Sequence, residues 1–217
     1  MKEKRRNKVV KHLGAKLPIR IEHYRRMRRL IRGGSVHQQA RNLLLINFQI
    51  NSSLRAGDLL RLEVGDVFDG ERFYDEFFLR QEKTGQTAAV KILPCMLKDL
   101  LLAKEAYGEV FYDYFADLER PLFPSRQREK GKVRPLSYSA YFALIKRLVI
   151  DLGLNPKQYA THSLRSTIPQ LHYEATNDIL GASKLFGHKR ISTTTIYLED
   201  VAKMKASHLR ERLFFDD

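Results

Sequence analysis

Residues 185–200 read LFGHKRISTTTIYLED, and the interpretation of the whole chain depends on the one tyrosine in this stretch, Tyr197. Most of the ten tyrosines in the chain must simply pack or lie half exposed, as amphipathic aromatic side chains do. Tyr197, however, follows a glycine–histidine pair, and His188 precedes it by nine residues. Segments further upstream decide whether Tyr197 only packs or also reacts.

The stretch THSLRSTIPQLHYE, residues 161–174, supplies a second histidine and an arginine. His162 and Arg165 are three residues apart, so on a helix they project from the same side. The pattern His-x-x-Arg is common by chance and carries little weight alone. Its place in the chain matters more, because His188 follows Arg165 after a further 23 residues.

Two earlier segments add charged side chains. In SLRAGDLLRL, residues 53–62, Arg55 opens a predicted helix and Asp58 lies one turn further on. Lys83 begins the triplet Lys-Thr-Gly, which joins two predicted strands and places an ammonium group on a hairpin.

These residue types suit an attack on a phosphodiester. A tyrosine hydroxyl has a pKa of about 10 and is a poor nucleophile at neutral pH unless nearby cations favour the phenolate. The guanidinium groups of Arg55 and Arg165 can each form bidentate hydrogen bonds with the non-bridging oxygens of the phosphate. They would stabilise the charge that develops on these oxygens. The departing 5′ oxygen needs a proton, which an ammonium group on a hairpin can supply.

The ordered set resembles the catalytic residues of the tyrosine recombinase (phage integrase) family: Arg55, Asp58, Lys83, His162, Arg165, His188 and Tyr197. The spelling LFGHKRISTTTIYL is similar to that family's nucleophile segment almost letter for letter. The resemblance covers roughly residues 35–200 and implies site-specific DNA strand exchange through a 3′-phosphotyrosine intermediate, without metal, ATP or another cofactor. It also implies that Lys83 protonates the leaving group, that either histidine positions or deprotonates Tyr197, and that Asp58 orients Arg55 or a histidine.

The charge balance agrees with a nucleic-acid partner. The 217 residues carry a net charge of +14, and a chain this basic commonly binds phosphate. Residues 1–32 hold thirteen Lys or Arg against two Glu. A helix over 23–32 would place four arginines on one face as DNA contacts: Arg25, Arg28, Arg29 and Arg32.

The hydrophobic pattern predicts a mainly α fold with a small antiparallel β-sheet (α+β), the fold of a tyrosine recombinase catalytic domain. The expected elements are helices over 35–51, 52–67, 95–117 and 137–152, shorter helices from 162 onward, strands over 72–81 and 86–94, and an exposed loop over 119–135. One sheet of two or three strands is expected.

Several classes of protein are disfavoured. Cys95 is the only cysteine, the seven histidines have no metal-ligand spacing, and no nucleotide-binding glycine loop is present, so neither metal nor cofactor is expected. No apolar run approaches the ~20 residues of a membrane span, so no membrane partner is expected. The expected location is the cytoplasm, in association with the nucleoid. The expected origin is a prokaryote or a phage.

The domain organisation follows from the resemblance. We expect a basic, DNA-contacting segment over 1–34 and a catalytic domain with a C-terminal helix over 35–217, without a separate core-binding domain. The expected partner is double-stranded DNA, bound by a homo-oligomer, a tetramer on paired sites, and accessory DNA-bending proteins are compatible with this role. The C-terminal helix carries Leu209, Leu213, Phe214 and Phe215, which would dock into a neighbouring subunit or onto the chain's own core.

Two other functions remain open at this point. A type IB topoisomerase shares much of the set, although His162 and the local spelling favour a recombinase. A non-catalytic DNA-binding regulator on the same fold would need only the basic face and would have no use for a hydroxyl nucleophile.

Overall fold

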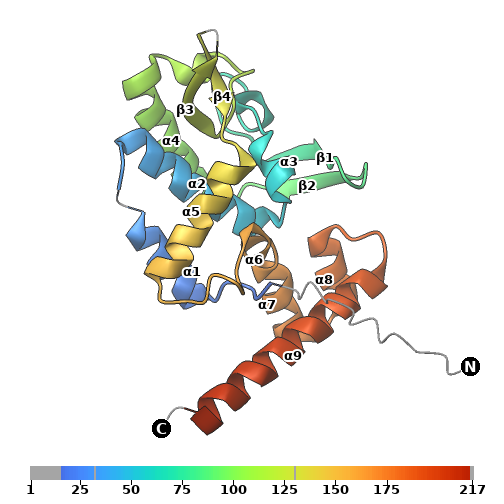
Figure 1. The fold of residues 1–217 in the computed structure, drawn as a ribbon. Helices are drawn as coiled ribbons and strands as arrows, with labels where there is room; N and C mark the ends of the chain where they lie inside the picture. Colours follow the sequence, from blue (N-terminus) through green and yellow to red (C-terminus); the bar gives the residue numbers. More distant parts are fainter. Residues whose placement is uncertain (1–15, 32, 130, 216–217) are drawn as a thin grey trace, which may run out of the picture.

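The computed structural model describes residues 16–31, 33–129 and 131–215, so Arg32 and most of the basic residues of segment 1–34 lie outside it. The chain folds into a mostly helical body, from which a long C-terminal helix projects (Figure 1). The α-helices are α1 (Ile21–Leu30), α2 (Val36–Ser52), α3 (Ala56–Leu60), α4 (Pro94–Phe111), α5 (Tyr138–Asp151), α6 (Thr161–Arg165), α7 (Thr167–Thr176), α8 (Ile179–Phe186) and α9 (Ile191–Phe215). Two short 3₁₀ helices, η1 (Val64–Asp66) and η2 (Tyr114–Ala116), lie between them.

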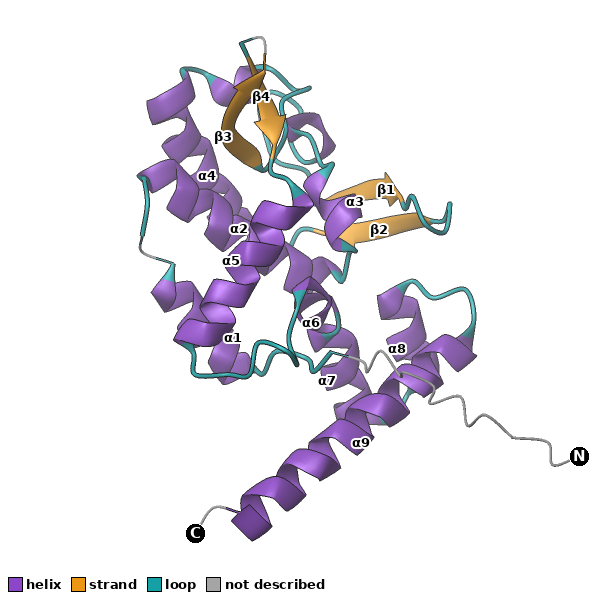
Figure 2. Cartoon of the chain, viewed as in Figure 1, coloured by secondary structure: helices purple, strands orange, loops and turns teal. Residues whose placement is uncertain are grey.

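Two separate antiparallel hairpins replace the single sheet expected from the sequence (Figure 2). Strand β1 (Glu76–Arg80) pairs with β2 (Thr87–Lys91), which confirms the first hairpin in shortened form. Strand β3 (Pro124–Glu129) pairs with β4 (Lys132–Pro135) inside the segment that was expected to be a loop. The expectation was wrong there because proline, glycine and charged residues mark exposed edge strands as well as loops.

The expected helix over 52–67 was also wrong in its length and start. Ser53 adopts a left-handed conformation, with φ of 53°, and ends α2 instead of capping a new helix. Helix α3 begins after Arg55 and lasts one turn, and the separate 3₁₀ turn η1 follows. Arg55 therefore stands at the start of a short helix, as the sequence suggested, with its backbone still extended.

Helices α2, α4 and α5 confirm the expected helical segments. Ser137 caps α5 by accepting a hydrogen bond from the amide of Ala140 at 3.2 Å. Helix α4 stops earlier than expected, because Tyr112 and Asp113 both have positive φ and divide it from η2.

The main hydrophobic core includes residues from the N-terminal basic segment, which was not expected to have a core of its own. Leu17, Ile19, Met27 and Ile31 are buried in the same cluster as the apolar side chains of α2, α4 and α5. Burial of these four side chains anchors the N-terminal segment to the helical body. In the described part of the chain, the boundary near residue 34 is therefore not a boundary between two cores.

A second, smaller apolar cluster lies between α8 and α9 and consists of Phe186, Tyr197, Leu198 and Val201. The amino-terminal turns of α9 pack on α8, and the helix then extends away from the body (Figure 1). Within the described residues, no helix is long and apolar enough to span a bilayer.

Candidate active site

Tyr197 lies in the small cluster with its ring between two aromatic neighbours. The ring meets His162 edge to face at 5.6 Å and Phe186 at 5.2 Å between centroids. Its hydroxyl donates a hydrogen bond to the backbone carbonyl of Lys16 at 3.1 Å. Burial raises the pKa of Tyr197 to about 12, and a contact with the Ser166 hydroxyl opposes that rise. Tyr197 is therefore protonated at neutral pH, and its attack requires a proton acceptor.

Arg165 is buried next to this cluster, with 2% of its surface exposed. One guanidinium nitrogen, Nη2, donates to the carbonyl of Phe186, whereas Nη1 is buried without a hydrogen-bond partner in the described structure. Burial, together with the nearby charge of Arg55, lowers the pKa of Arg165 to about 9, while Asp58 acts in the opposite direction. A buried cation with an unpaired donor is costly alone, and an anion in front of it would satisfy both charge and donor.

Two histidines flank Tyr197 in the neutral state. The His188 ring stacks on Phe186 at 4.7 Å, with 1° between the ring planes, and its Nδ1 lies 2.8 Å from the hydroxyl of Thr194. Partial burial, followed by the charges of Arg165 and Arg55, lowers the pKa of both His162 and His188 to about 4. His162 is nevertheless exposed as a residue, so water screens part of this effect there. Imidazoles with so low a pKa are neutral at pH 7 but weak bases, and an anion bound beside them would raise the pKa of both.

Arg55 is fixed by a residue that sequence reasoning missed. Its Nη1 donates to Oε1 of Gln81 at 2.6 Å. Gln81 is buried and lies directly after β1. The sequence gives no recognisable sign that Gln81 contacts Arg55. Its only distinguishing feature is its position two residues before Lys83.

Among the described residues, no hydrogen bond joins Asp58 to Arg55 or to a histidine, the groups that the resemblance implies it orients. Its Oδ1 accepts bonds from Nη2 of Arg61 at 2.7 Å and from the amide of Glu82 at 2.9 Å. The buried carboxylate thus ties the β1–β2 turn to α3. Its influence on Arg165 is electrostatic, since it raises the pKa that burial lowers.

Lys83 is exposed in the turn between β1 and β2. Gly85 closes this turn with φ of +66°, a conformation that favours glycine. The charges of Arg55 and Arg165 thus act on both histidines. Tyr197 joins this group through its ring contact with His162, and Lys83 lies in the β1–β2 turn.

The predicted DNA-binding arginines on α1 have different surroundings. Arg25 and Arg29 are exposed, as a phosphate contact requires. Arg28, in contrast, forms two hydrogen bonds with Asp99, of 2.6 and 2.8 Å, and this carboxylate raises its pKa. Arg28 therefore joins α1 to α4, because its charge is already matched by a buried carboxylate. Arg32 lies outside the described residues.

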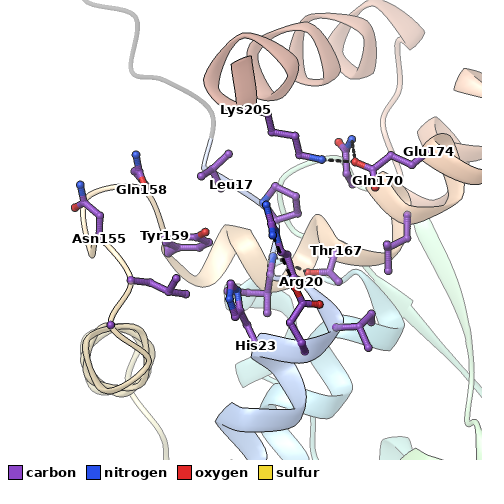
Figure 3. Close-up of a pocket in the computed structure, with 17 residues that line it drawn as sticks. Leu17, Arg20, His23, Asn155, Gln158, Tyr159, Thr167, Gln170, Glu174 and Lys205 are labelled. Atoms are coloured by element: carbon purple, nitrogen blue, oxygen red, sulfur yellow. Dashed lines mark hydrogen bonds and ion pairs between the residues drawn. The ribbon is translucent and has the colours of Figure 1, made fainter. Parts of the chain in front are cut away.

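A groove of about 930 Å³ separates the N-terminal segment from α7 and the loop after α5. Figure 3 shows its lining, including Leu17 and Tyr159 and the contact between Lys205 and Glu174. None of the predicted catalytic residues lines this groove, so the groove is distinct from the cluster around Tyr197. Among the described residues, no three His, Cys, Asp or Glu side chains are grouped to hold a metal ion.

The site thus combines a buried tyrosine, two histidines and two arginines, one of which has an unpaired donor, within an α+β domain. The profile of the Phage integrase family matches residues 22–204. The probable integrase/recombinase YoeC of Bacillus subtilis is 27% identical over 165 residues, which is 75% of this chain and 80% of YoeC. The tyrosine recombinase XerA of Pyrococcus horikoshii is 28% identical over 179 residues, 82% of this chain and 56% of XerA. The chain belongs to the phage integrase family, and the resemblance inferred from its sequence is confirmed.

Solved structures confirm the fold. A XerA recombinase superposes with a TM-score of 0.62 at 19% identity, over 89% of this chain and 64% of that protein. The XerH site-specific recombinase in a post-cleavage complex with palindromic difH substrate gives 0.60 at 20% identity, over 94% of this chain and 54% of XerH. The chain spans about half the length of the curated Xer recombinases that it matches.

Proposed function

We propose that this chain cleaves and rejoins DNA at specific sites, with Tyr197 as the nucleophile. The phenolic oxygen attacks the phosphorus of a DNA phosphodiester, a P–O bond to tyrosine forms, and the P–O5′ bond breaks. The products are a 3′-phosphotyrosine and a free 5′ hydroxyl. Attack by a 5′ hydroxyl on the phosphotyrosine reverses these steps and rejoins a strand, and because the bond energy is retained, no nucleotide is consumed.

The observation that carries this proposal is the buried, unpartnered Nη1 of Arg165 beside the Tyr197 cluster. A phosphodiester oxygen is a suitable acceptor for that donor. Arg55 supplies a second guanidinium, close enough for its charge to act on Arg165. Charge that develops on the non-bridging oxygens is stabilised most strongly in such a desolvated place. The two cations therefore favour the transition state over the bound ground state.

Proton transfer is assigned to the remaining residues. His162 and His188 are neutral at pH 7, so either can take the Tyr197 proton once phosphate binds. Lys83 is exposed on its hairpin and would protonate the leaving 5′ oxygen when DNA lies against the turn. Asp58 supports this arrangement by holding the hairpin to α3.

Double-stranded DNA and further copies of this chain are the proposed partners. One structural neighbour is described as a lambda integrase tetramer bound to a Holliday junction, and XerH is described as bound to a palindromic site. A tetramer on two paired sites, linked through the end of α9, fits the same chemistry. Accessory DNA-bending proteins and a location with prokaryotic or phage DNA belong to this proposal as well.

The test is covalent capture of the cleaved strand. The protein is incubated with nicked duplexes from the genome that encodes it, and protein–DNA adducts are separated on denaturing gels. We expect a 3′-linked adduct that disappears in Tyr197→Phe. Tyr173→Phe is the matched control, because Tyr173 packs against the same small cluster and should leave the adduct intact.

The outcomes separate the candidate functions. A sequence-dependent adduct supports the recombinase, whereas relaxation of supercoiled DNA without sequence preference would support a topoisomerase. Salt-sensitive DNA binding without any adduct on these substrates would overturn the enzymatic proposal in favour of a regulator.

A further inference from the structure

Gln81 lies where three segments that carry predicted catalytic residues meet. Its Oε1 accepts hydrogen bonds from Nη1 of Arg55 at 2.6 Å and from the hydroxyl of Thr84 at 3.1 Å. Its Nε2 lies 2.9 Å from the place where a Cβ on Gly187 would stand. Gln81 thus contacts the start of α3, the turn that holds Lys83, and the turn that precedes His188.

The backbone of Gln81 also closes the Lys83 turn. Its amide donates to the carbonyl of Gln86, and its carbonyl accepts from the amide of Gly85, both at 2.8 Å. The next residue, Glu82, is held by Asp58 through its amide. Residues 81 and 82 are therefore fixed to α3 through these hydrogen bonds, and the exposed Lys83 follows them directly in the turn.

The side-chain amide of Gln81 packs closely against Gly187. This glycine has φ of +61° and ends α8 in the left-handed region, where a larger residue is strained. A side chain there would also collide with the Gln81 amide. The glutamine and the glycine therefore fit each other across the site.

A neutral acceptor is well suited to Arg55. The arginine side chain is long, and without a partner it would sample several rotamers away from the charge of Arg165. A carboxylate would fix it but would cancel the charge that a phosphate needs. An amide oxygen fixes the guanidinium and leaves its charge available.

We propose that Gln81 is a positioning residue, which holds Arg55 in the orientation that receives the phosphate and couples the Lys83 turn to it. This inference rests on the proposed function of DNA cleavage. Gln81 itself touches no reacting atom, so its effect must pass through Arg55 and the hairpin.

The test is a double-mutant cycle in the full chain, measured as the cleavage rate constant on the nicked duplex and as DNA affinity. We expect Gln81→Met to slow cleavage about 10- to 100-fold, because misplacing a binding group by about 1 Å has effects of this size. DNA affinity should stay within about twofold, since most phosphate contacts are elsewhere. In an Arg55→Lys background the additional loss from Gln81→Met should shrink below about threefold.

Controls separate positioning from folding. Gln86→Met makes the same substitution at an exposed position of the same hairpin and should leave the rate unchanged. If Gln81→Met does not fold, as judged by its thermal unfolding curve, Gln81→Asn serves instead. It keeps the amide but withdraws it by one methylene, and the same loss and the same dependence on Arg55 are expected.

Three results would overturn the inference. Gln81→Met or Gln81→Asn could cleave like the wild type, or the loss could be equally large in the Arg55→Lys background. In both cases the wild type still cleaves, so only the role of Gln81 fails. A wild-type chain that forms no adduct overturns the proposed function and the inference with it.

Discussion

Two arginines in different parts of the molecule, Arg28 on α1 and Arg165 on α6, were both expected to meet phosphate. Arg28 grips the buried carboxylate of Asp99 with two hydrogen bonds and closes a network between α1, α2 and α4. Arg165 is more deeply buried, yet one of its nitrogens has no partner. The first cation is satisfied within the fold, and the second has a donor left for a ligand.

The difference shows that a buried charged side chain can serve either the stability of the fold or the binding of a ligand. A cation paired with a buried carboxylate stabilises the fold, mostly because removing it would strand the opposite charge. A buried cation with an unmatched donor lowers stability, and under the proposed function the phosphate of the DNA would match it. Substitution of Arg165 should therefore lower the cleavage rate more than the stability, and substitution of Arg28 should lower the stability more than the cleavage rate.

The largest effect is expected at Arg165. Arg165→Met should reduce the cleavage rate about 10²- to 10³-fold, as does the loss of one donor that stabilises a developing oxyanion. The free energy of unfolding should change by less than about 1 kcal/mol, because the lost charge was costly to bury. Cleavage assays and urea unfolding of the same preparation measure both quantities. A stable Arg165→Met variant that cleaves at the wild-type rate would contradict the proposed role of Arg165 in binding phosphate.

At Arg28 the signature should be reversed. Arg28→Met should lower the free energy of unfolding by about 2–3 kcal/mol, somewhat below the range for fully buried pairs, because the side chain is 28% exposed. The folded variant should cleave within about threefold of the wild type. Urea unfolding again provides the measurement. Asp99→Asn in the same chain should restore most of the lost stability, and additive losses from the two substitutions would contradict the pairing argument.

The smallest effect is expected at the exposed arginines of the same helix. Arg25→Gln and Arg29→Gln should each change stability by less than about 0.5 kcal/mol. If each contacts a DNA phosphate, the slope of log affinity against log salt should fall by about one per substitution. Arg72→Gln, at an exposed position in the loop before β1, is the control for loss of surface charge. Slopes equal to that of the control would show that this face of α1 does not meet DNA.

Much of the architecture could be predicted because it follows from local patterns. The apolar periodicity of α2, the serine before α5 and the Lys-Thr-Gly turn each determine an element within a few residues of sequence. The order of Arg55, His162, Arg165, His188 and Tyr197 was equally informative, because the family's signature is itself a pattern of spacing.

What the sequence could not provide are contacts between distant segments. The partner of Arg28 is 71 residues away, and the partner of Arg55 is a glutamine with no distinguishing neighbours. The β3–β4 hairpin was missed because it is charged, bulged and lies at the surface, so its strands lack an alternating apolar face.

The hydrogen bond from Tyr197 to the carbonyl of Lys16 sets an order of events. A phenol has a single proton, and a hydroxyl that donates it to a peptide group cannot hand it to a histidine at the same moment. The contact joins residues 181 positions apart, so a displacement of the segment around Lys16 would break a hydrogen bond of the proposed nucleophile. In the proposed reaction this hydrogen bond must break before Tyr197 gives up its proton, so the first step involves no DNA bond at all.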